Sequence, residues 1–228
     1  YRFAKDWQAG ISLPYVWNDN SYSGVSSQTS GLGDTAVSLT YEVLDDNSAW
    51  KVRDIGDMTP GVSVGLSLLV PTGISPYDNQ QSSFDITGRG FYRLDGTLLV
   101  EKTIRPWNAS LSLTYGTYLE RTINREYGKY VEPYKKDLGD RFSASLSTGY
   151  TYVIGTGGDS ITGTASYAYM KEADASFNGK QDSGSGFNKQ SVGMALSYSN
   201  NDNNWSARAG WNHAIKMNGW EKTSRQQM

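Results

Sequence analysis

The sequence predicts an all-β fold, namely a transmembrane, antiparallel, up-and-down β-barrel of about 12 strands, with about 10 strands as the alternative. Three observations lead to this prediction. Apolar and polar residues alternate in about nine extended stretches, which is the period of strands with one apolar and one polar face. Short and long connections follow one another between these stretches. Aromatic residues of the apolar parity gather toward the ends of the stretches, whereas the middles carry Leu, Val, Ile and Ala.

Each expected strand is recognised by the apolar residues that share one parity. The alternation is clearest in GVSVGLSLLVPTG, where Gly and Ser fill the opposite parity. The first four expected strands and their apolar residues are 7–17 (Trp7, Ala9, Ile11, Leu13, Tyr15, Trp17), 33–43 (Val37, Leu39, Tyr41, Val43), 61–73 (Val62, Val64, Leu66, Leu68, Val70) and 91–104 (Leu94, Leu98, Val100, Ile104).

Five further expected strands continue the pattern, with Ser, Thr, Gly and isolated charges on the polar parity. They are 108–119 (Leu111, Leu113, Tyr115, Leu119), 141–152 (Phe142, Ala144, Leu146, Tyr150, Tyr152), 161–170 (Ile161, Ala165, Tyr167, Tyr169), 191–199 (Val192, Met194, Leu196, Tyr198) and 205–216 (Trp205, Ala207, Ala209, Trp211, Ile215). We therefore expect residues 1–228 to form one barrel domain that lacks part of its first strand and its last strands.

The connections predict that one end of the sheet carries tight turns and the other end long loops. The short connections are 4–6, 105–107, 153–160 and 200–204, and the long ones are 18–32, 74–90, 120–140 and 171–190. Segment 45–59 is the exception, because it has intermediate length in a short position. Short periplasmic turns and long extracellular loops are typical of outer-membrane barrels, whereas a Greek-key sandwich has no reason to keep this rhythm.

Composition excludes several classes of function. The net charge is −2 without a basic block, so we expect no nucleic-acid partner. Cysteine is absent and His213 is the only histidine, so we expect no metal, no cofactor and no catalytic site. No apolar run approaches the roughly 18 residues of a membrane helix. The mean hydropathy of −0.55 is compatible with a barrel, in which outward apolar residues alternate with inward polar ones.

The apolar face is predicted to contact lipid, although a soluble sheet with one buried face also alternates. A polar face in bulk water usually carries Lys, Glu and Thr, whereas small hydroxylated residues suit a confined lumen. Charged residues within the strands keep to the polar parity or to strand ends, as expected where Arg or Lys at the bilayer midplane costs roughly 2–4 kcal/mol. Aromatic side chains expected at the lipid interface are Trp7, Tyr15, Trp17, Trp107, Tyr150, Tyr152, Tyr169, Tyr198, Trp205 and Trp211.

Charged residues of the polar parity are the candidate pore lining. They are Asp34, Glu42, Arg93, Asp95, Glu101, Glu120, Arg141 and Arg208. Opposite charges that face each other across a lumen select permeants. The alternative is that neighbours such as Arg93 and Asp95 simply neutralise each other within a wet wall.

Three segments also resemble a known family. In WQAGISLPYV, GLGDTAVSLTYEV and VGLSLLVPTG, the sequence resembles a family of Gram-negative outer-membrane barrels named for a phenol-degradation pathway and often described as transporters. The match covers roughly the first third of the chain. The functional-amyloid secretion channel FapF, a barrel of similar build, is a candidate relative. The resemblance implies passive transport through a barrel and brings no catalytic residues.

We therefore predict a non-enzymatic channel in the bacterial outer membrane, with lipid and lipopolysaccharide as its surroundings. Its permeant is a solute or a polypeptide that passes through the polar lumen, and one version is the uptake of small, aromatic solutes. One alternative is export of an unfolded, amyloid-type polypeptide, gated by a plug outside this sequence. Another is a non-conducting adhesin or scaffold. A homotrimer is kept open as an oligomeric state.

Overall fold

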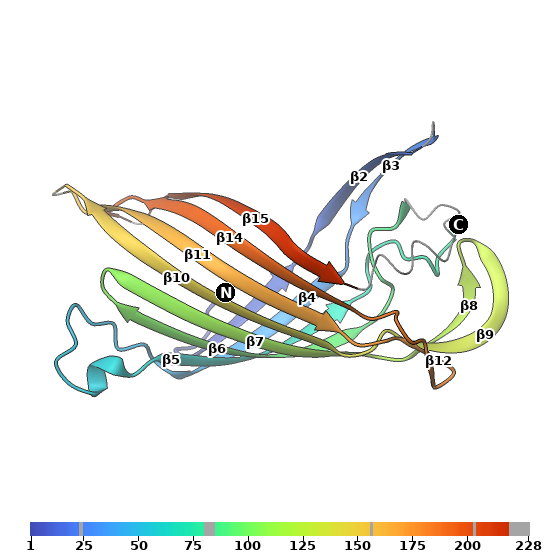
Figure 1. Ribbon diagram of the computed structural model, residues 1–228, viewed down its shortest axis with the longest axis horizontal. Helices are drawn as coiled ribbons and strands as arrows, with labels where there is room; N and C mark the ends of the chain where they lie inside the picture. The colour runs from blue at the N-terminus through green and yellow to red at the C-terminus, as the bar shows by residue number, and fades with distance from the viewer. Residues whose placement is uncertain (23–24, 80–84, 156, 203, 219–228) are drawn as a thin grey trace.

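The chain folds into antiparallel β-sheets in the computed structural model (Figure 1). The structure describes residues 1–22, 25–79, 85–155, 157–202 and 204–218. Within these ranges the helical content is one 3-10 turn, Gly56–Met58, and no helix is both long and apolar enough to cross a membrane. The predicted all-β class is confirmed.

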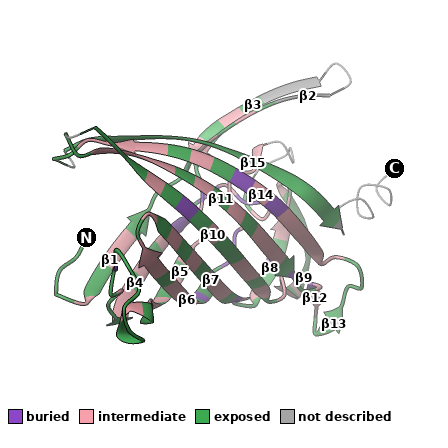
Figure 2. Ribbon diagram, turned by 60° about the vertical axis from the view of Figure 1, so that its left-hand side comes forward, coloured by how far each residue is buried: buried purple, intermediate pink, exposed green. Residues whose placement is uncertain are grey.

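Nine strands form the main sheet, and each pairs with its neighbours in an up-and-down order. In sheet order they are β1 (Trp7–Ser12), β4 (Thr35–Leu44), β5 (Gly61–Val70), β6 (Arg93–Ile104), β7 (Trp107–Tyr118), β10 (Arg141–Ile154), β11 (Asp159–Glu172), β14 (Phe187–Ser199) and β15 (Ser206–Asn218). Figures 1 and 2 show this sheet curled into a trough. Among the described residues β1 and β15 are its open edges, so the sheet is not closed and the strand number of a complete barrel stays a prediction.

Every predicted strand overlaps one strand of the main sheet, but the prediction of a single strand over 7–17 is wrong. β1 ends at Ser12, and the chain leaves the sheet at Leu13 and Pro14. Proline has no backbone N–H for a sheet hydrogen bond, so it favours a strand end. Tyr15 begins β2 (Tyr15–Tyr22), which pairs with β3 (Val25–Leu32) as a separate hairpin that projects beyond the sheet (Figure 1).

The predicted long loops also contain strands that the sequence did not indicate. Segment 120–140 forms β8 (Arg121–Glu126) and β9 (Lys129–Asp137), joined by a turn in which Tyr127 and Gly128 have positive φ. Two short strands, β12 (Ser176–Phe177) and β13 (Lys180–Gln181), extend this sheet in the order β13-β12-β9-β8. Apolar and polar residues do not alternate in these strands, because the strands lie beyond the main sheet and do not separate an apolar face from a polar one.

Pairing register keeps the two faces of the main sheet distinct. Leu66 lies opposite Leu39 and Gly96, whereas Ser67 lies opposite Ser38 and Asp95. Exposed and less exposed residues therefore alternate along the strands (Figure 2). Leu66 itself is 60% exposed. The convex face of the trough is thus apolar and open, which is the arrangement that a lipid environment would cover.

The buried core is small and lies at the long-loop end of the trough. Phe91, Tyr118 and Ile123 are buried, and four half-buried apolar residues pack against them: Tyr77, Val131, Tyr134 and Leu138. These residues come from segment 71–92, the end of β7 and the β8–β9 hairpin. The long connections therefore fold against one another at the mouth of the trough, while the wall itself has no conventional core.

Candidate functional site

The concave face of the trough is lined largely by polar residues. Along β7, the inward residues from the turn end to the loop end are Asn108, Ser110, Ser112, Thr114, Gly116 and Tyr118. Asn108 and Ser110 line a cavity of about 620 Å³, whereas Ser112 and Thr114 line a second cavity of about 420 Å³. Tyr118 lies beyond both, at the loop end. The inward residues of this one strand thus extend along the trough from its turn end to its loop end.

Hydroxyl groups of neighbouring strands bond to each other across this wall. The Thr97 and Thr114 hydroxyls are 3.0 Å apart, those of Ser110 and Ser147 are 2.8 Å apart, and those of Thr151 and Thr162 are 2.9 Å apart. Each hydroxyl keeps further donor or acceptor capacity, because it has one hydrogen and two lone pairs. The wall can therefore hydrogen-bond water or a polar solute with little fixed charge.

The larger cavity, at the turn end, places opposite charges on different strands. Glu101 comes from β6 and Arg208 from β15, and both line this cavity. They do not form an ion pair with each other. Asp46 also reaches this cavity but is bound to Lys102, with 2.9 Å between Oδ1 and Nζ. Because β6 and β15 lie far apart in the sheet order, their charges approach each other only through the curvature of the sheet.

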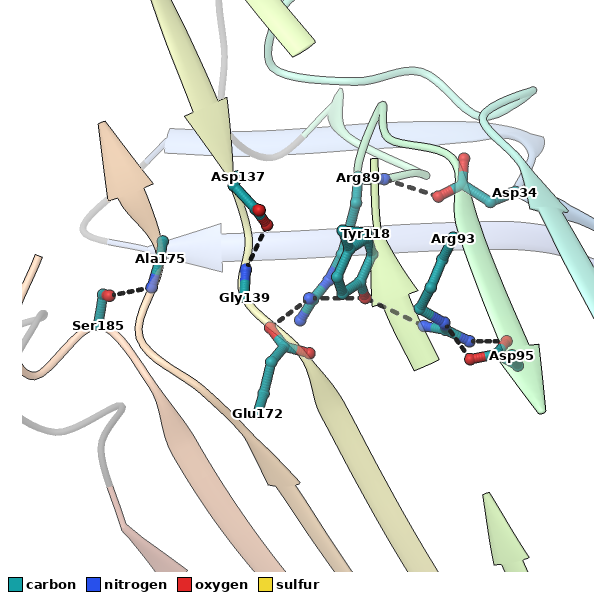
Figure 3. Close-up of polar contacts among 10 residues, drawn as sticks. All are labelled: Asp34, Arg89, Arg93, Asp95, Tyr118, Asp137, Gly139, Glu172, Ala175 and Ser185. Carbon is teal, nitrogen blue, oxygen red and sulfur yellow. Dashed lines mark hydrogen bonds and ion pairs between the residues drawn. The ribbon is translucent and has the colours of Figure 1, made fainter. Parts of the chain in front are cut away.

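A chain of polar contacts that we call the rim network lies at the loop end of the trough (Figure 3); its members are Asp95, Arg93, Tyr118, Arg89 and Glu172. Arg93 binds Asp95 through two contacts, Nε–Oδ1 at 2.7 Å and Nη2–Oδ2 at 3.0 Å. The Tyr118 hydroxyl accepts hydrogen bonds from Arg93 at 3.0 Å and from Arg89 at 3.1 Å. Arg89 also donates to Glu172 at 2.5 Å. The Tyr118 hydroxyl therefore connects the Arg93–Asp95 ion pair to the Arg89–Glu172 ion pair.

Electrostatic attraction within the rim network outweighs the effect of burial and favours the ion-paired state. Burial lowers the pKa of the Arg89 guanidinium, but the combined attraction of Tyr118 and Glu172 outweighs it and leaves that pKa above the usual value. The Glu172 side chain is only 8% exposed. Its second oxygen, Oε2, is buried without a hydrogen-bond partner among the described residues. Glu172 therefore depends on Arg89 for its neutralisation.

Asp34 anchors the segment that carries Arg89. Its carboxylate accepts the backbone N–H of Gly73 at 3.2 Å and that of Arg89 at 2.8 Å, from the two ends of segment 71–92 (Figure 3 shows the Arg89 bond). Asp34 precedes β4, whereas Glu172 ends β11, and four strands of the sheet lie between them: β5, β6, β7 and β10. Residues 85–92 therefore connect the start of β4 with the end of β11 across the mouth of the trough.

The apolar cluster behind the rim network holds two tyrosines in their neutral form. Burial, with a further contribution from Glu126, raises the pKa of Tyr77 to about 12. Burial and a hydrogen bond to Glu126 also raise the pKa of Tyr134. Lys136 lies 5.5 Å from the Tyr77 ring centre and 4.7 Å from that of Phe177. The closure of the mouth thus combines apolar packing, cation–π contacts and ion pairs.

Gly88→Ala is expected to loosen this closure. A Cβ on Gly88 would overlap the Asp34 carboxylate and lie 2.9 Å from the Cα of Gly73, so Asp34 would have to release the segment. We expect protease cleavage within 71–92 to become at least about tenfold faster, equivalent to a loss of about 1.4 kcal/mol in local stability. Gly96→Ala is the matched control, because the nearest atom to its Cβ is 4.0 Å away. Equal cleavage rates in the two variants would contradict the role of Asp34 as the anchor.

Comparisons with known proteins agree with this architecture. The model of the family described as "Putative MetA-pathway of phenol degradation" matches residues 3–219. The chain belongs to this family. The predicted relationship is therefore confirmed over nearly the whole chain and not only its first third. The relationship to FapF stays a prediction.

One solved structure shares this fold although its sequence is only distantly similar. It is the crystal structure of the COG4313 outer membrane channel from Pseudomonas putida F1, with a TM-score of 0.66 and 10% sequence identity. The alignment covers 96% of this chain and 74% of that chain. This likeness shows that the two chains share a fold.

The structure places six of the eight candidate pore residues of this family member in three parts of the interior. Arg93, Asp95 and Asp34 lie at the loop-end mouth, Arg141 lines the smaller cavity, and Glu101 and Arg208 line the larger one. Glu120 pairs with Lys135 at 2.9 Å outside the sheet, and Glu42 pairs with Arg2. The neutralisation of Arg93 by Asp95, which the sequence left open, is present.

Sequence reasoning missed four residues of the interior: Arg89, Tyr118, Glu172 and Lys189. Tyr118 and Glu172 are the last residues of β7 and β11, and Lys189 lies near the start of β14. Tyr118 already lay on the polar parity of the expected strand 108–119 without being named as a pore candidate. Glu172 and Lys189 fell in the expected loop 171–190, so only exact strand ends could have placed these two in the wall. Arg89 lies in an irregular segment without periodicity, so no pattern could have brought it to Glu172.

Most of the predicted interface aromatics lie on the outer face. Eight of the ten are exposed: Trp7, Tyr15, Trp17, Trp107, Tyr150, Tyr152, Trp205 and Trp211. Tyr169 and Tyr198 are half-buried. Three pairs join neighbouring strands at the turn end, Trp7–Tyr41, Trp107–Tyr150 and Tyr198–Trp205, with ring centres 4.8, 4.8 and 4.9 Å apart. Tyr15 and Trp17 instead lie on the β2–β3 hairpin, and His213 stacks on Trp211.

Proposed function

We propose that this protein is a passive channel of the bacterial outer membrane that lets small polar solutes cross through the trough. The observation that carries the proposal is an inner wall rich in hydroxyl groups behind an exposed apolar outer wall. Water-filled barrels need this combination, because lipid requires an apolar surface and permeants require hydrogen-bond partners. The likeness to a solved outer-membrane channel supports it.

We further propose that additional strands pair along the edges β1 and β15 and close the sheet into a barrel, for which about 12 strands is the expected number. Unpaired backbone groups at open edges would each cost several kcal/mol within hydrocarbon. Closure would enclose the two cavities in one lumen. The rim network and segment 71–92 then form its narrow end, and the transport step needs no catalytic residue.

Planar-bilayer recording tests the function. We expect the purified protein to give small, steady conductance steps, because the described residues 71–79 and 85–92 narrow the mouth without the need for a separate plug. Liposomes that contain the protein should also swell in small neutral solutes such as glycerol, and not in large ones such as stachyose. Heat-denatured protein is the control.

The alternatives give different outcomes in the same recordings. An export channel for an unfolded polypeptide would show large openings only after a plug is removed. A surface adhesin or scaffold would show no conductance and no liposome swelling. Either result would overturn the proposed solute channel.

A further inference from the structure

We propose that the smaller cavity is an anion subsite built on Arg141 and Lys189, so that the channel favours small anions, carboxylates among them, over cations. This inference rests on the proposed channel function and names its permeant class. Neither residue is used by the rim network, and Lys189 was not among the candidates that the sequence provided.

The two cations share one cavity because of the sheet register. Ser143 of β10, Met170 of β11 and Lys189 of β14 form one row across three adjacent strands. Arg141 lies two residues from Ser143 on the same face of β10. Both cationic side chains line the cavity of about 420 Å³, and both are half-buried. An anion in this cavity would therefore meet two positive charges from strands that do not contact each other.

Nothing in the cavity wall neutralises these charges. No carboxylate lines the cavity among the residues that the structure describes. In the same part of the chain, Arg141 and Lys189 take no part in an ion pair. Glu172, the register partner of Arg141, is bound by Arg89, and the nearby Asp95 is bound by Arg93. The charges within each ion pair of the rim network cancel. The positive charges of Arg141 and Lys189 therefore remain without a neighbouring counter-charge.

Hydroxyl groups complete the chemistry of an anion subsite. Ser112, Thr114, Ser143, Ser145 and Ser191 line the same cavity. Hydroxyls can donate to an anion and replace part of its water shell, while guanidinium and ammonium groups supply the charge. In the larger cavity, by contrast, Glu101 offsets Arg208, and Asp46 is bound by Lys102. The excess positive charge is therefore confined to the loop-end half of the trough.

Zero-current potentials in a KCl gradient test the inference. We expect the unmodified channel to pass Cl⁻ at least about threefold better than K⁺, and Arg141→Gln with Lys189→Gln to bring this ratio close to one. The charge-matched control is Lys129→Gln with Lys180→Gln, which removes two exposed cations from the β9 and β13 hairpin strands and should leave the ratio unchanged. The exchange Arg141→Lys with Lys189→Arg should preserve the preference for Cl⁻.

Several outcomes would overturn the inference: a preference for K⁺ in the unmodified channel, or a Cl⁻ preference that survives the double Gln variant. A complete lack of conductance would instead refute the proposed function. In that case the subsite is tested by a measurement that does not depend on conductance. Crystals soaked in sodium bromide should show an anomalous peak at Arg141 and Lys189 that the double Gln variant lacks, and absence of that peak would refute the subsite itself.

Discussion

Leu66→Arg is expected to prevent assembly in lipid bilayers, whereas Ser67→Arg should assemble normally. Leu66 lies on the convex apolar face, and its register partners are Leu39 and Gly96 in the middle of the sheet. An arginine at such a depth costs roughly 2–4 kcal/mol, which is a large part of a typical folding free energy. Ser67 faces the trough opposite Asp95, so an arginine there enters water near a carboxylate.

Folded and unfolded barrels differ in gel mobility before heating, and urea titration in vesicles gives the free energy of unfolding. These two measurements check the pair of variants. Leu66→Ala is the control for the loss of the leucine side chain, and it should retain most of the folded fraction. If both arginine variants assembled equally, the assignment of the two faces to lipid and water would be wrong.

Arg89→Ala is expected to increase the single-channel conductance severalfold and to destabilise the loop end of the protein. Without Arg89, the Glu172 carboxylate is buried and has no cationic partner, for which roughly 3–5 kcal/mol is the usual cost in a buried pair. The cost here should fall below that range because the Arg89 side chain is 38% exposed. The connection between segment 71–92 and β11 is lost with the ion pair, so the mouth widens.

Adding Glu172→Gln to Arg89→Ala separates the two effects. The double variant removes the uncompensated charge, so it should regain stability in urea titration but keep the higher conductance. Arg89→Lys should remain closer to the unmodified protein, since it preserves the charge but not both contacts. An unchanged conductance in Arg89→Ala would show that the rim network does not narrow the path.

The strands of the main sheet could be predicted because each carries its own evidence. In β5 and β7, residues two apart meet the same surroundings, so Leu66 and Leu68 or Ser110 and Ser112 report the face directly. The same local rule failed at 7–17, where apolar parity continues through Pro14 although the chain leaves the sheet. Parity records which side a residue faces, but not which sheet it joins.

The loop end could not be predicted by the same reasoning. In β8, RTINRE shows no apolar face, although Ile123 becomes one of the most buried residues through its contact with Phe91 and Tyr118. Arg89 and Glu172 are 83 residues apart in sequence, and their bond exists only because residues 85–92 lie across the mouth. Neither contact produces a periodic pattern in the sequence.

Alternation along the chain was thus sufficient for the all-β class, the two faces of the wall and the separation of tight turns from long connections. These properties depend on local geometry, since successive side chains of a strand point to opposite sides. The closure of the mouth, the pairing of Arg89 with Glu172 and the shared cavity of Arg141 and Lys189 were decided by sheet curvature and register. Those relations join residues from distant strands, and a one-dimensional pattern contains no information about which strands meet.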